Sequence, residues 1–384
     1  MNRIRTAVIG TGFMGRSHLE ALRRVENVDV VEIAGTSLEK ARAAAAGYNV
    51  LNATGDWRDV IADPSIDAVH ITTPNVSHFP IARAAFEAGK HVLCEKPLAM
   101  TVAEAEELVA LAAAKERRGG LNHNLRYYPM VQQMRSMREA GAFGDILVVQ
   151  GTYSQDWLLY QTDWNWRIDP AVSGASRVMA DIGSHFFDMA EHVTGLKVTE
   201  LCSDWATFWP VRKRPEGGGE TFSGLASGAT IDTPVVTEDF GATLFRMGPK
   251  GARQARGAMT ASQVSSGRKN GLVIEIYGTK GGATWRQECP DELWLGHRDA
   301  LNRTLLKDPP LLTEQARAFA DYPGGHGEGY PDTFKQLFRR FYASIADPGM
   351  APEYPQMADG LRQLRILEAE LASNKTRGWV TIPD

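Results

Sequence analysis

The chain has 384 residues, of which 43% are hydrophobic, 23% charged and 9% aromatic. This composition excludes a disordered, collagen-like or coiled-coil protein, and the length predicts two domains that each bury a core. The formal net charge is −4 and no basic stripe runs along the sequence, so we expect no nucleic-acid partner. Charges interrupt every apolar stretch before the roughly 18–20 residues of a spanning helix, so we expect no membrane partner.

The cysteines predict a reducing compartment. Cys94, Cys202 and Cys289 lie far apart and form no C-x-x-C pair, which predicts neither a disulfide framework nor a thiolate metal site. The N-terminal residues pass directly into a strand-like segment, without the charged and apolar regions of a secretory signal. We therefore expect a cytoplasmic protein.

Short apolar segments alternate with helical segments over about the first 120 residues. This alternation predicts an α/β domain with a doubly wound parallel sheet, the Rossmann fold. Thr101 and Glu104 form a capping-box pattern at the start of one helix. The expected strands are 5–9, 28–34, 68–72, 91–94 and 120–123, and the expected helices are 14–25, 38–46, 79–88 and 102–115.

Longer β-like runs separated by Gly- and Pro-rich turns begin near residue 145 and predict an α+β domain with a large, mainly antiparallel open sheet. The expected elements are strands 146–153, 235–247, 256–265, 272–277 and 292–295, helices 179–193, 333–345 and 357–371, and a surface loop over 214–228. We expect an NAD(P)-binding domain over 1–125 and a substrate-binding and oligomerisation domain over 126–384. The C-terminal helix is expected to pack back on the first domain.

The segment Gly10-Thr11-Gly12-Phe13-Met14-Gly15 matches G-x-G-x-x-G between an expected strand and helix, which is the context of a dinucleotide-binding loop. Gly10 permits the tight turn, Gly12 lets a pyrophosphate approach the backbone, and Gly15 lets the helix pack closely on the strand. The free N–H groups of the helix then bind the anion. An ordinary glycine-rich turn is the alternative.

The residues after the second strand do not decide between NAD and NADP. Gly35, Thr36 and Ser37 include no acid for the 2′-hydroxyl of NAD and no arginine for the 2′-phosphate of NADP. Lys40 and Arg42 lie one turn further on. We expect NAD or NADP, with NAD slightly favoured, and count Thr36 and Ser37 among the cofactor-binding residues.

Lys96 follows the strand at 91–94 directly and therefore lies at the carboxyl edge of the sheet, where ligands bind. Pro97 could form a cis turn that directs Lys96 toward a ligand, and a solvated surface lysine is the alternative. In the second half, Asp181 and His185 are four residues apart, and Asp188 and His192 continue the same helical face. Catalysis, a metal site and a capping network are equal interpretations of this group.

These segments, together with TPNVSH at 73–78, NLRYYP at 124–129 and EIYGTKGG at 275–282, resemble the Gfo/Idh/MocA oxidoreductases over nearly the whole chain. The resemblance implies no metal and a catalytic set of Lys96, Asp181 and His185. It implies hydride transfer between a carbinol carbon and the nicotinamide ring. His185 then acts as the base, because its unperturbed pKa of about 6.5 lies near working pH. Lys96 stabilises alkoxide charge, while Asp181 orients a hydroxyl and helps keep Lys96 charged.

The resemblance also implies that the loop after the strand at 68–72 runs along the nicotinamide ribose, although a simple turn is an equal alternative for His78. The full set of expected cofactor contacts is Gly10, Gly12, Phe13, Met14, Gly15, Thr36, Ser37, Thr73, Pro74, Asn75, His78, Glu95, Lys96 and Arg167.

Five of the nine tryptophans fall between Trp157 and Trp209. Indole rings can cover the apolar C–H faces of a sugar while interleaved polar groups bind its hydroxyls, and a core or subunit-contact role is the alternative. The segments around Trp157 and Arg167 are most similar to levoglucosan- and glycoside-oxidising members of the family. The expected substrate-binding residues are Lys96, Arg126, Tyr127, Trp157, Trp164, Asp181, His185 and His326.

We therefore expect an NAD(P)-dependent dehydrogenase of a cyclic sugar, glycoside or polyol. An NAD-dependent glycoside hydrolase that acts by transient oxidation is one alternative. A non-enzymatic sensor of NAD(P) and sugar is another, although the retained Lys96, Asp181 and His185 argue against it. The family usually buries its open sheet face between subunits, so we expect a homodimer or homotetramer.

Overall fold

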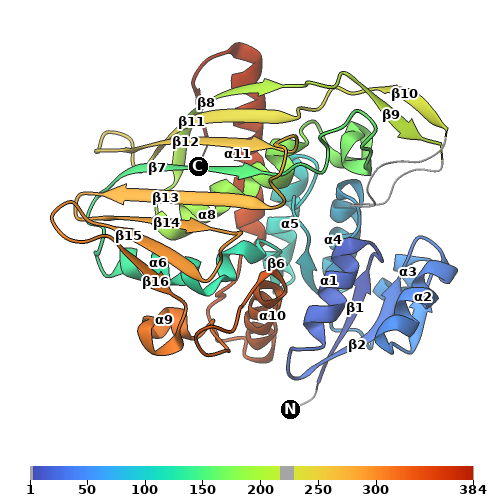
Figure 1. The fold of residues 1–384 in the computed structure, drawn as a ribbon. Coiled ribbons are helices and arrows are strands. Elements are labelled where there is room, and N and C mark those ends of the chain that lie inside the picture. Colours follow the sequence, from blue (N-terminus) through green and yellow to red (C-terminus); the bar gives the residue numbers. More distant parts are fainter. Residues whose placement is uncertain (1–2, 217–228, 384) are drawn as a thin grey trace. The chain divides into compact units, whose positions relative to one another are not determined.

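The computed structural model describes residues 3–216 and 229–383, and the chain forms two compact units (Figure 1). Unit 1 consists of Met1–Asn124 and Tyr330–Leu364, and unit 2 of Leu125–Gly329 and Arg365–Asp384. The functional division expected at residue 125 stays a prediction. Within the described ranges, every helix is too short or too polar to cross a membrane.

Unit 1 is built on a six-stranded parallel sheet with the order β3-β2-β1-β4-β5-β6, which confirms the expected doubly wound fold. Its strands are β1 (Ile4–Ile9), β2 (Val28–Ala34), β3 (Asn52–Thr54), β4 (Ala68–Ile71), β5 (His91–Cys94) and β6 (Gly119–Leu121). Its helices are α1 (Phe13–Leu22), α2 (Leu38–Tyr48), α3 (Trp57–Ala62), α4 (His78–Glu87), α5 (Val102–Ala114) and α10 (Tyr330–Ala346). The short β3 and α3 were not expected from the sequence.

The helices of unit 1 form two groups. Helix α1 packs with α2 and α10, while α4 packs with α5. Right-handed crossovers on both sides of β1 place these groups on opposite faces of the sheet. Every residue of β4 is buried, as a strand covered on both faces requires. Helix α5 begins with the expected capping box, in which Thr101 and Glu104 bind each other's backbone N–H groups.

Unit 2 is built on a nine-stranded sheet with the order β16-β15-β14-β13-β7-β12-β11-β8-β17, and a separate hairpin pairs β9 with β10. Among the described strands of the sheet, β7 and β12 are parallel and the other neighbours are antiparallel. The strands are β7 (Ile146–Ser154), β8 (Val198–Ala206), β9 (Val211–Pro215), β10 (Thr230–Pro234), β11 (Phe240–Met247), β12 (Ala255–Ser262), β13 (Gly271–Gly278), β14 (Gly282–Arg286), β15 (Glu292–Gly296), β16 (Arg303–Leu306) and β17 (Val380–Thr381).

The helices of unit 2 cover one side of its sheet, and the strands stand in front of them in Figure 1. Helix α8 packs on β7 and β13, α6 packs on β14 and β15, and α11 contributes Glu370 beneath β11. These helices are α6 (Pro129–Glu139), α8 (Ser184–Thr194) and the part of α11 (Met357–Thr376) from Arg365 onward, with short turns at α7 (Pro170–Ser173) and α9 (Glu314–Arg317).

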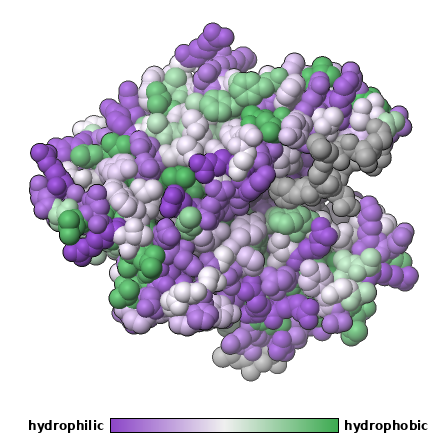
Figure 2. Space-filling model, viewed as in Figure 1, coloured by the Kyte–Doolittle hydropathy of each residue, from purple (hydrophilic) through white to green (hydrophobic). Residues whose placement is uncertain are grey.

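The other face of this sheet is open. The strand register places one residue of each neighbouring strand in a row across it, namely Glu275, Gln150, Ala258, Leu244 and Cys202. Leu244 is 54% exposed. Figure 2 shows this side of the sheet, where apolar residues lie interspersed with hydrophilic ones. The open sheet expected from the sequence is therefore confirmed.

Three expected elements of unit 2 differ from the structure. The strand expected from residue 235 begins only at Phe240, because Glu238 and Asp239 turn inward to bind other segments. The helix expected over 179–193 opens with a π-helical turn before α8 begins. Of the loop expected over 214–228, Arg214 and Pro215 belong to β9, and 217–228 lie outside the described residues.

Glu370 is a carboxyl group buried between α11 and the sheet. It is 1% exposed and accepts a hydrogen bond from the Thr243 hydroxyl at 2.7 Å. Burial disfavours the carboxylate, and although the Thr243 hydrogen bond opposes this, the pKa of Glu370 rises to about 8. The folded chain therefore holds a proton near neutral pH that the unfolded chain releases.

This proton predicts a pH-dependent stability. Between the ordinary pKa of 4.5 and the raised value of about 8, the Glu370 contribution to the free energy of unfolding should fall by about 1.4 kcal/mol per pH unit as the pH rises. Glu370→Gln should remove that slope, as measured by urea unfolding from pH 5 to 9. Glu368→Gln, on the exposed side of α11, is the control. An unchanged slope in Glu370→Gln would contradict the prediction.

Candidate functional site

The glycine loop after β1 has the geometry that a dinucleotide requires. Gly10 has a φ of +117°, and a Cβ there would lie 2.5 Å from the Thr72 hydroxyl oxygen. A Cβ on Gly15 would lie 2.1 Å from the Gly10 carbonyl oxygen, whereas a Cβ on Gly12 would meet no described atom within 4 Å. Packing therefore requires the first and third glycines. The second leaves open space before the N-terminus of α1, which fits a bound pyrophosphate.

Lys96 lies at the carboxyl edge of the same sheet, two residues after the end of β5. The Lys96–Pro97 peptide bond is cis, as the sequence suggested. His78 joins this turn to the loop after β4, with Nδ1 2.7 Å from the Pro97 carbonyl oxygen and Nε2 2.8 Å from that of Thr73. His78 is 1% exposed, and burial lowers its pKa although both carbonyl contacts oppose the shift. Its geometry is that of a clamp between two loops.

The remaining predicted cofactor residues of unit 1 lie near this edge. Ser37 caps α2 by accepting a hydrogen bond from the Lys40 N–H at 3.3 Å, and Thr36 is exposed beside it. Asn75 belongs to a 3₁₀ turn that leads from Pro74 into α4. Their contacts with a dinucleotide stay predictions.

In unit 2, Asp181 and His185 lie on either side of the junction between the π turn η4 (Met179–Gly183) and α8. Single π turns inside helices occur frequently at functional sites. Asp181 accepts hydrogen bonds from Gln263 Nε2 at 2.9 Å and from Arg167 Nε at 3.3 Å. His185 is 8% exposed, and its ring lies 6.2 Å from that of Tyr153 on β7.

A buried carboxylate fixes the start of this helical segment. Glu238 accepts hydrogen bonds from the Ser176 hydroxyl at 2.7 Å and from the backbone N–H groups of Arg177 and Met179 at 3.0 and 2.9 Å. These contacts bind donors that a helix start leaves without intrahelical partners. Burial raises the pKa of Glu238, and its hydrogen bonds limit the rise. The backbone that carries Asp181 is therefore anchored from outside the helix.

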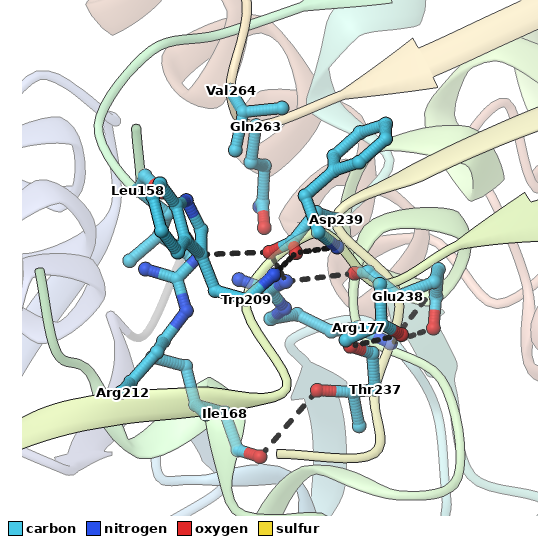
Figure 3. A network of polar contacts seen from close by, with 12 residues as sticks. Leu158, Ile168, Arg177, Trp209, Arg212, Thr237, Glu238, Asp239, Gln263 and Val264 are labelled. Carbon is cyan, nitrogen blue, oxygen red and sulfur yellow. Dashed lines mark hydrogen bonds and ion pairs between the residues drawn. The ribbon is translucent and has the colours of Figure 1, made fainter. Parts of the chain in front are cut away.

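Next to Glu238, Asp239 lies between two buried guanidinium groups (Figure 3). Arg177 and Arg212 both donate to Asp239 Oδ1, and the N–H groups of Phe208 and Trp209 donate to Oδ2 at 2.7 and 3.1 Å. Burial alone would raise the pKa of Asp239, but the two positive charges outweigh it and hold the pKa below its usual value.

This network also holds the segment that carries the predicted substrate tryptophans. Arg212 donates to the carbonyl oxygens of Leu158, Tyr160 and Asp163 at 2.9, 2.9 and 3.2 Å. Trp157 and Trp164 are partly buried against a cluster of Leu158, Ile168 and Val235. The two indoles therefore pack against buried residues of a segment whose carbonyl groups Arg212 binds.

The structure accounts differently for several other predicted residues. Arg126 donates through two nitrogens to Asp188, with Nε at 2.8 Å, and Tyr127 is 3% exposed with its ring 5.8 Å from that of Phe319. Arg167 stacks 4.5 Å from the Trp166 ring centre while donating to Asp181. Their contacts with substrate or cofactor stay predictions.

His326 is exposed in a loop that Lys307 organises. The Lys307 ammonium donates to the carbonyl oxygen of His326 at 2.7 Å and pairs with Glu328 at 2.8 Å. The role of His326 with substrate stays a prediction.

The interpretation of the Asp181–His192 face as a metal site finds no matching geometry. Asp188 is engaged by Arg126, and His192 Nε2 lies 3.2 Å from Gln132 Nε2. Among the residues at 3–216 and 229–383, no group of three His, Cys, Asp or Glu side chains is arranged to hold a metal ion.

Sequence reasoning missed the residues that hold the site. Gln263, Arg177, Arg212, Glu238 and Asp239 are all buried, and their side chains join residues up to 82 positions apart. No spacing pattern relates them. The sequence offered only a weak signal for these residues, namely charged residues at the borders of β-like runs. A charged residue that is buried there needs a charged partner.

The Asp239 network predicts a large loss of stability in Asp239→Asn. Two buried guanidinium groups would then share no carboxylate, which should lower the free energy of unfolding by about 3–5 kcal/mol. Asp232→Asn is the matched control, because the Asp232–Lys213 pair is mostly exposed and should contribute at most about 1 kcal/mol. Urea unfolding measures both. Equal losses in the two variants would contradict the prediction.

Comparisons with known proteins agree with the fold and the glycine loop. The family model described as "Oxidoreductase family, NAD-binding Rossmann fold" matches residues 4–123, and the GFO/IDH/MocA C-terminal domain matches 131–284. Levoglucosan dehydrogenase of Pseudarthrobacter phenanthrenivorans is 32% identical over all of this chain and 99% of its own length.

Several solved structures align with the complete chain. An oxidoreductase domain protein from Kribbella flavida has a TM-score of 0.89 and 32% identity, with 100% of both chains covered. A levoglucosan dehydrogenase in complex with NADH and L-sorbose has a TM-score of 0.88 and 31% identity, with the same coverage. The chain thus belongs to the Gfo/Idh/MocA family of oxidoreductases and carries its NAD-binding Rossmann fold.

Proposed function

We propose that this chain is a dehydrogenase that transfers hydride between NAD and a hydroxyl-bearing carbon of a cyclic sugar, glycoside or polyol. The observation that carries the proposal is similarity along the complete chain to a levoglucosan dehydrogenase whose structure holds NADH and L-sorbose. The open space beside Gly12, at the start of α1, supports the binding of NAD in this proposal. The partly buried Trp157 and Trp164 support the sugar part, because indole faces match the C–H faces of a sugar ring.

In the proposed mechanism, Lys96, Asp181 and His185 act on one substrate hydroxyl. Bound NAD would supply the acceptor for the hydride of the carbinol carbon. His185 removes the hydroxyl proton, and the Lys96 ammonium stabilises the negative charge that develops on the oxygen. Asp181 orients the substrate, which suits a carboxylate already held by Gln263 and Arg167. These roles come from the family resemblance.

The N–H groups at the start of α1 would hold the pyrophosphate in this proposal, and Thr36 and Ser37 would lie beside the adenosine ribose. The loop from Thr73 to His78 would lie along the nicotinamide ribose. We propose NAD as the preferred dinucleotide, because no basic side chain occupies position 36 or 37.

The test is a screen of sugars, glycosides and cyclitols with both NAD and NADP, read as NADH or NADPH formation. His185→Ala should lower kcat on the best substrate by about 10²–10⁴-fold, and Lys96→Ala by about 10²–10³-fold. His297→Ala, an exposed histidine of unit 2, is the control. Full activity in the His185 and Lys96 variants would refute the assignment.

The same assay separates the two rival functions. Cleavage of a glycoside without net NADH would indicate the NAD-dependent hydrolase, whereas net NADH without cleavage supports the dehydrogenase. Binding of NADH and sugar without turnover would indicate the sensor.

We also propose that copies of the chain associate through the open face of the nine-stranded sheet. An exposed, mixed apolar row that includes Leu244 supports this proposal. Leu244→Lys should reduce the mass measured by light scattering at micromolar concentration, because it would bury a charge in the contact. Leu306→Lys is the control, since Leu306 is similarly exposed but lies on the edge strand β16. A monomeric wild-type chain would contradict the proposal.

A further inference from the structure

A continuous chain of hydrogen bonds crosses the interior of unit 1 and ends at Glu95, beside Lys96. Glu95 Oε1 lies 2.9 Å from His18 Nε2, and His18 Nδ1 lies 2.8 Å from His70 Nδ1. His70 Nε2 lies 2.8 Å from the Tyr342 hydroxyl, which donates to Thr6 Oγ1 at 2.8 Å. Thr6 in turn donates to the Ala68 carbonyl oxygen at 3.0 Å.

The residues of this hydrogen-bond chain are buried away from solvent. Thr6, His18 and His70 are each 0% exposed, and Glu95 and Tyr342 are 4% and 3% exposed. Aromatic rings of α10 close over the two histidines: the Phe338 ring centre lies 4.9 Å from that of His18 and 4.8 Å from that of His70. Buried polar groups of this kind are costly unless every donor meets an acceptor.

The far end of the chain fixes the direction of every proton in it. A carbonyl oxygen only accepts, so Thr6 must donate to Ala68. The single proton of Thr6 is then used, and Tyr342 must donate to Thr6. Tyr342 therefore accepts from His70 Nε2–H, which leaves Nδ1 of a neutral His70 as an acceptor.

His18 must consequently carry a proton on Nδ1, and the other end of the chain decides its second nitrogen. Glu95 Oε1 accepts from the Asn122 amide at 2.5 Å, and Oε2 accepts from the Lys96 backbone N–H at 3.3 Å. Donors on both oxygens favour a carboxylate. His18 Nε2 then also donates, so His18 is an imidazolium paired with a carboxylate.

The directions in which the pKa values of Glu95 and His70 shift fit the states assigned to these two residues. Burial alone would raise the pKa of Glu95, but the hydrogen bond and charge of His18, together with the charge of Lys96, hold it below its usual value. Burial and the charge of His18 hold the pKa of His70 well below its usual value, so His70 is neutral.

We propose that His18 is a positioning residue, whose imidazolium holds the Glu95 carboxylate in place so that Glu95 fixes the backbone of Lys96. The expected effect on turnover rests on the proposed function of Lys96. The structural half of the inference, namely the charge of His18 and its hold on Glu95, does not. The His18 imidazolium lies on α1, the helix that follows the glycine loop. The N-terminus of this helix would bind the dinucleotide, and its His18 side chain would hold the turn at Lys96.

The charged and titratable groups that face Glu95 are His18 on α1, His78 on α4, the neighbouring Cys94 thiol at the end of β5, and Lys96 in the turn that follows. In His18→Gln the buried carboxylate would lose its counter-charge, and burial would favour its protonated form at neutral pH. The hold on the Lys96 N–H would then weaken, and raising the pH would restore it.

The structural half is tested without turnover by ¹⁵N NMR of histidine-labelled protein, with the His18 signals assigned through His18→Gln. Both ring nitrogens should be protonated at pH 7. In Tyr342→Phe, His70 can place its proton on Nδ1, so His18 should lose a proton and become neutral. Tyr354→Phe, a buried tyrosine of unit 1 outside the chain, should leave His18 unchanged. A neutral His18 in the wild type would overturn the proposal.

Hydrogen exchange of the Lys96 amide tests positioning separately. Exchange should be on the order of ten-fold faster in His18→Gln than in the wild type at pH 7, while the Val8 amide in the sheet serves as the internal reference. Equal acceleration at both amides would indicate general loosening of the unit and overturn the positioning role.

Turnover completes the test once a substrate is known. In His18→Gln, kcat should fall on the order of ten-fold at pH 7 and recover at higher pH, with the KM for NAD nearly unchanged. Glu95→Gln should lose kcat without such recovery. A uniform loss with an unchanged pH profile in both variants would overturn the proposal. If the wild type oxidises no sugar, the proposed function fails, while NMR and exchange still decide the role of His18.

Discussion

The parallel direction of six strands is the constraint on which the arrangement of unit 1 depends. Parallel strands place all their carboxyl ends at one edge, so the turns after β1, β4, β5 and β6 become neighbours although they lie up to about 110 residues apart. The glycine loop, the Thr73 turn and Lys96 therefore gather at one edge before any side chain contributes. Side chains such as His78 then lock neighbouring turns together, with one ring facing two carbonyl groups.

Both units contain buried charged side chains. The free-energy cost of burying a charge explains why each of these side chains has hydrogen-bond and charge partners. Asp239 lies between two guanidinium groups and accepts two backbone N–H groups, so each of its oxygens is satisfied. Glu95 is satisfied in the same manner by His18, Asn122 and the Lys96 N–H. A buried ion pair contributes little net stability compared with an apolar core, but removing one partner is expensive. Such networks therefore make the local backbone geometry hard to change.

Local signals made the fold of unit 1 predictable. The glycine loop, the capping box at Thr101 and the buried β4 follow from short-range patterns, and the family resemblance supplied the candidate residues Lys96, Asp181 and His185. Contacts between distant residues were not predictable: His18, His70 and Tyr342 are separated by 52 and 272 positions, and no spacing relates them. The strand expected from residue 235 failed for the same reason, because Asp239 is drawn inward by Arg177 and Arg212.

The same physical device recurs in both units. In unit 1 the carboxylate of Glu95 holds the backbone N–H of the proposed catalytic lysine, and in unit 2 the carboxylate of Glu238 holds the backbone N–H of Met179, two residues before Asp181. A carboxylate that accepts from a backbone N–H group fixes the main chain rather than the reactive side chain itself. Electrostatic stabilisation of a transition state depends on groups that are already oriented before reaction. Anchoring the backbone through buried carboxylates contributes to that orientation, and in unit 2 Gln263 and Arg167 add to it by donating directly to the Asp181 carboxylate.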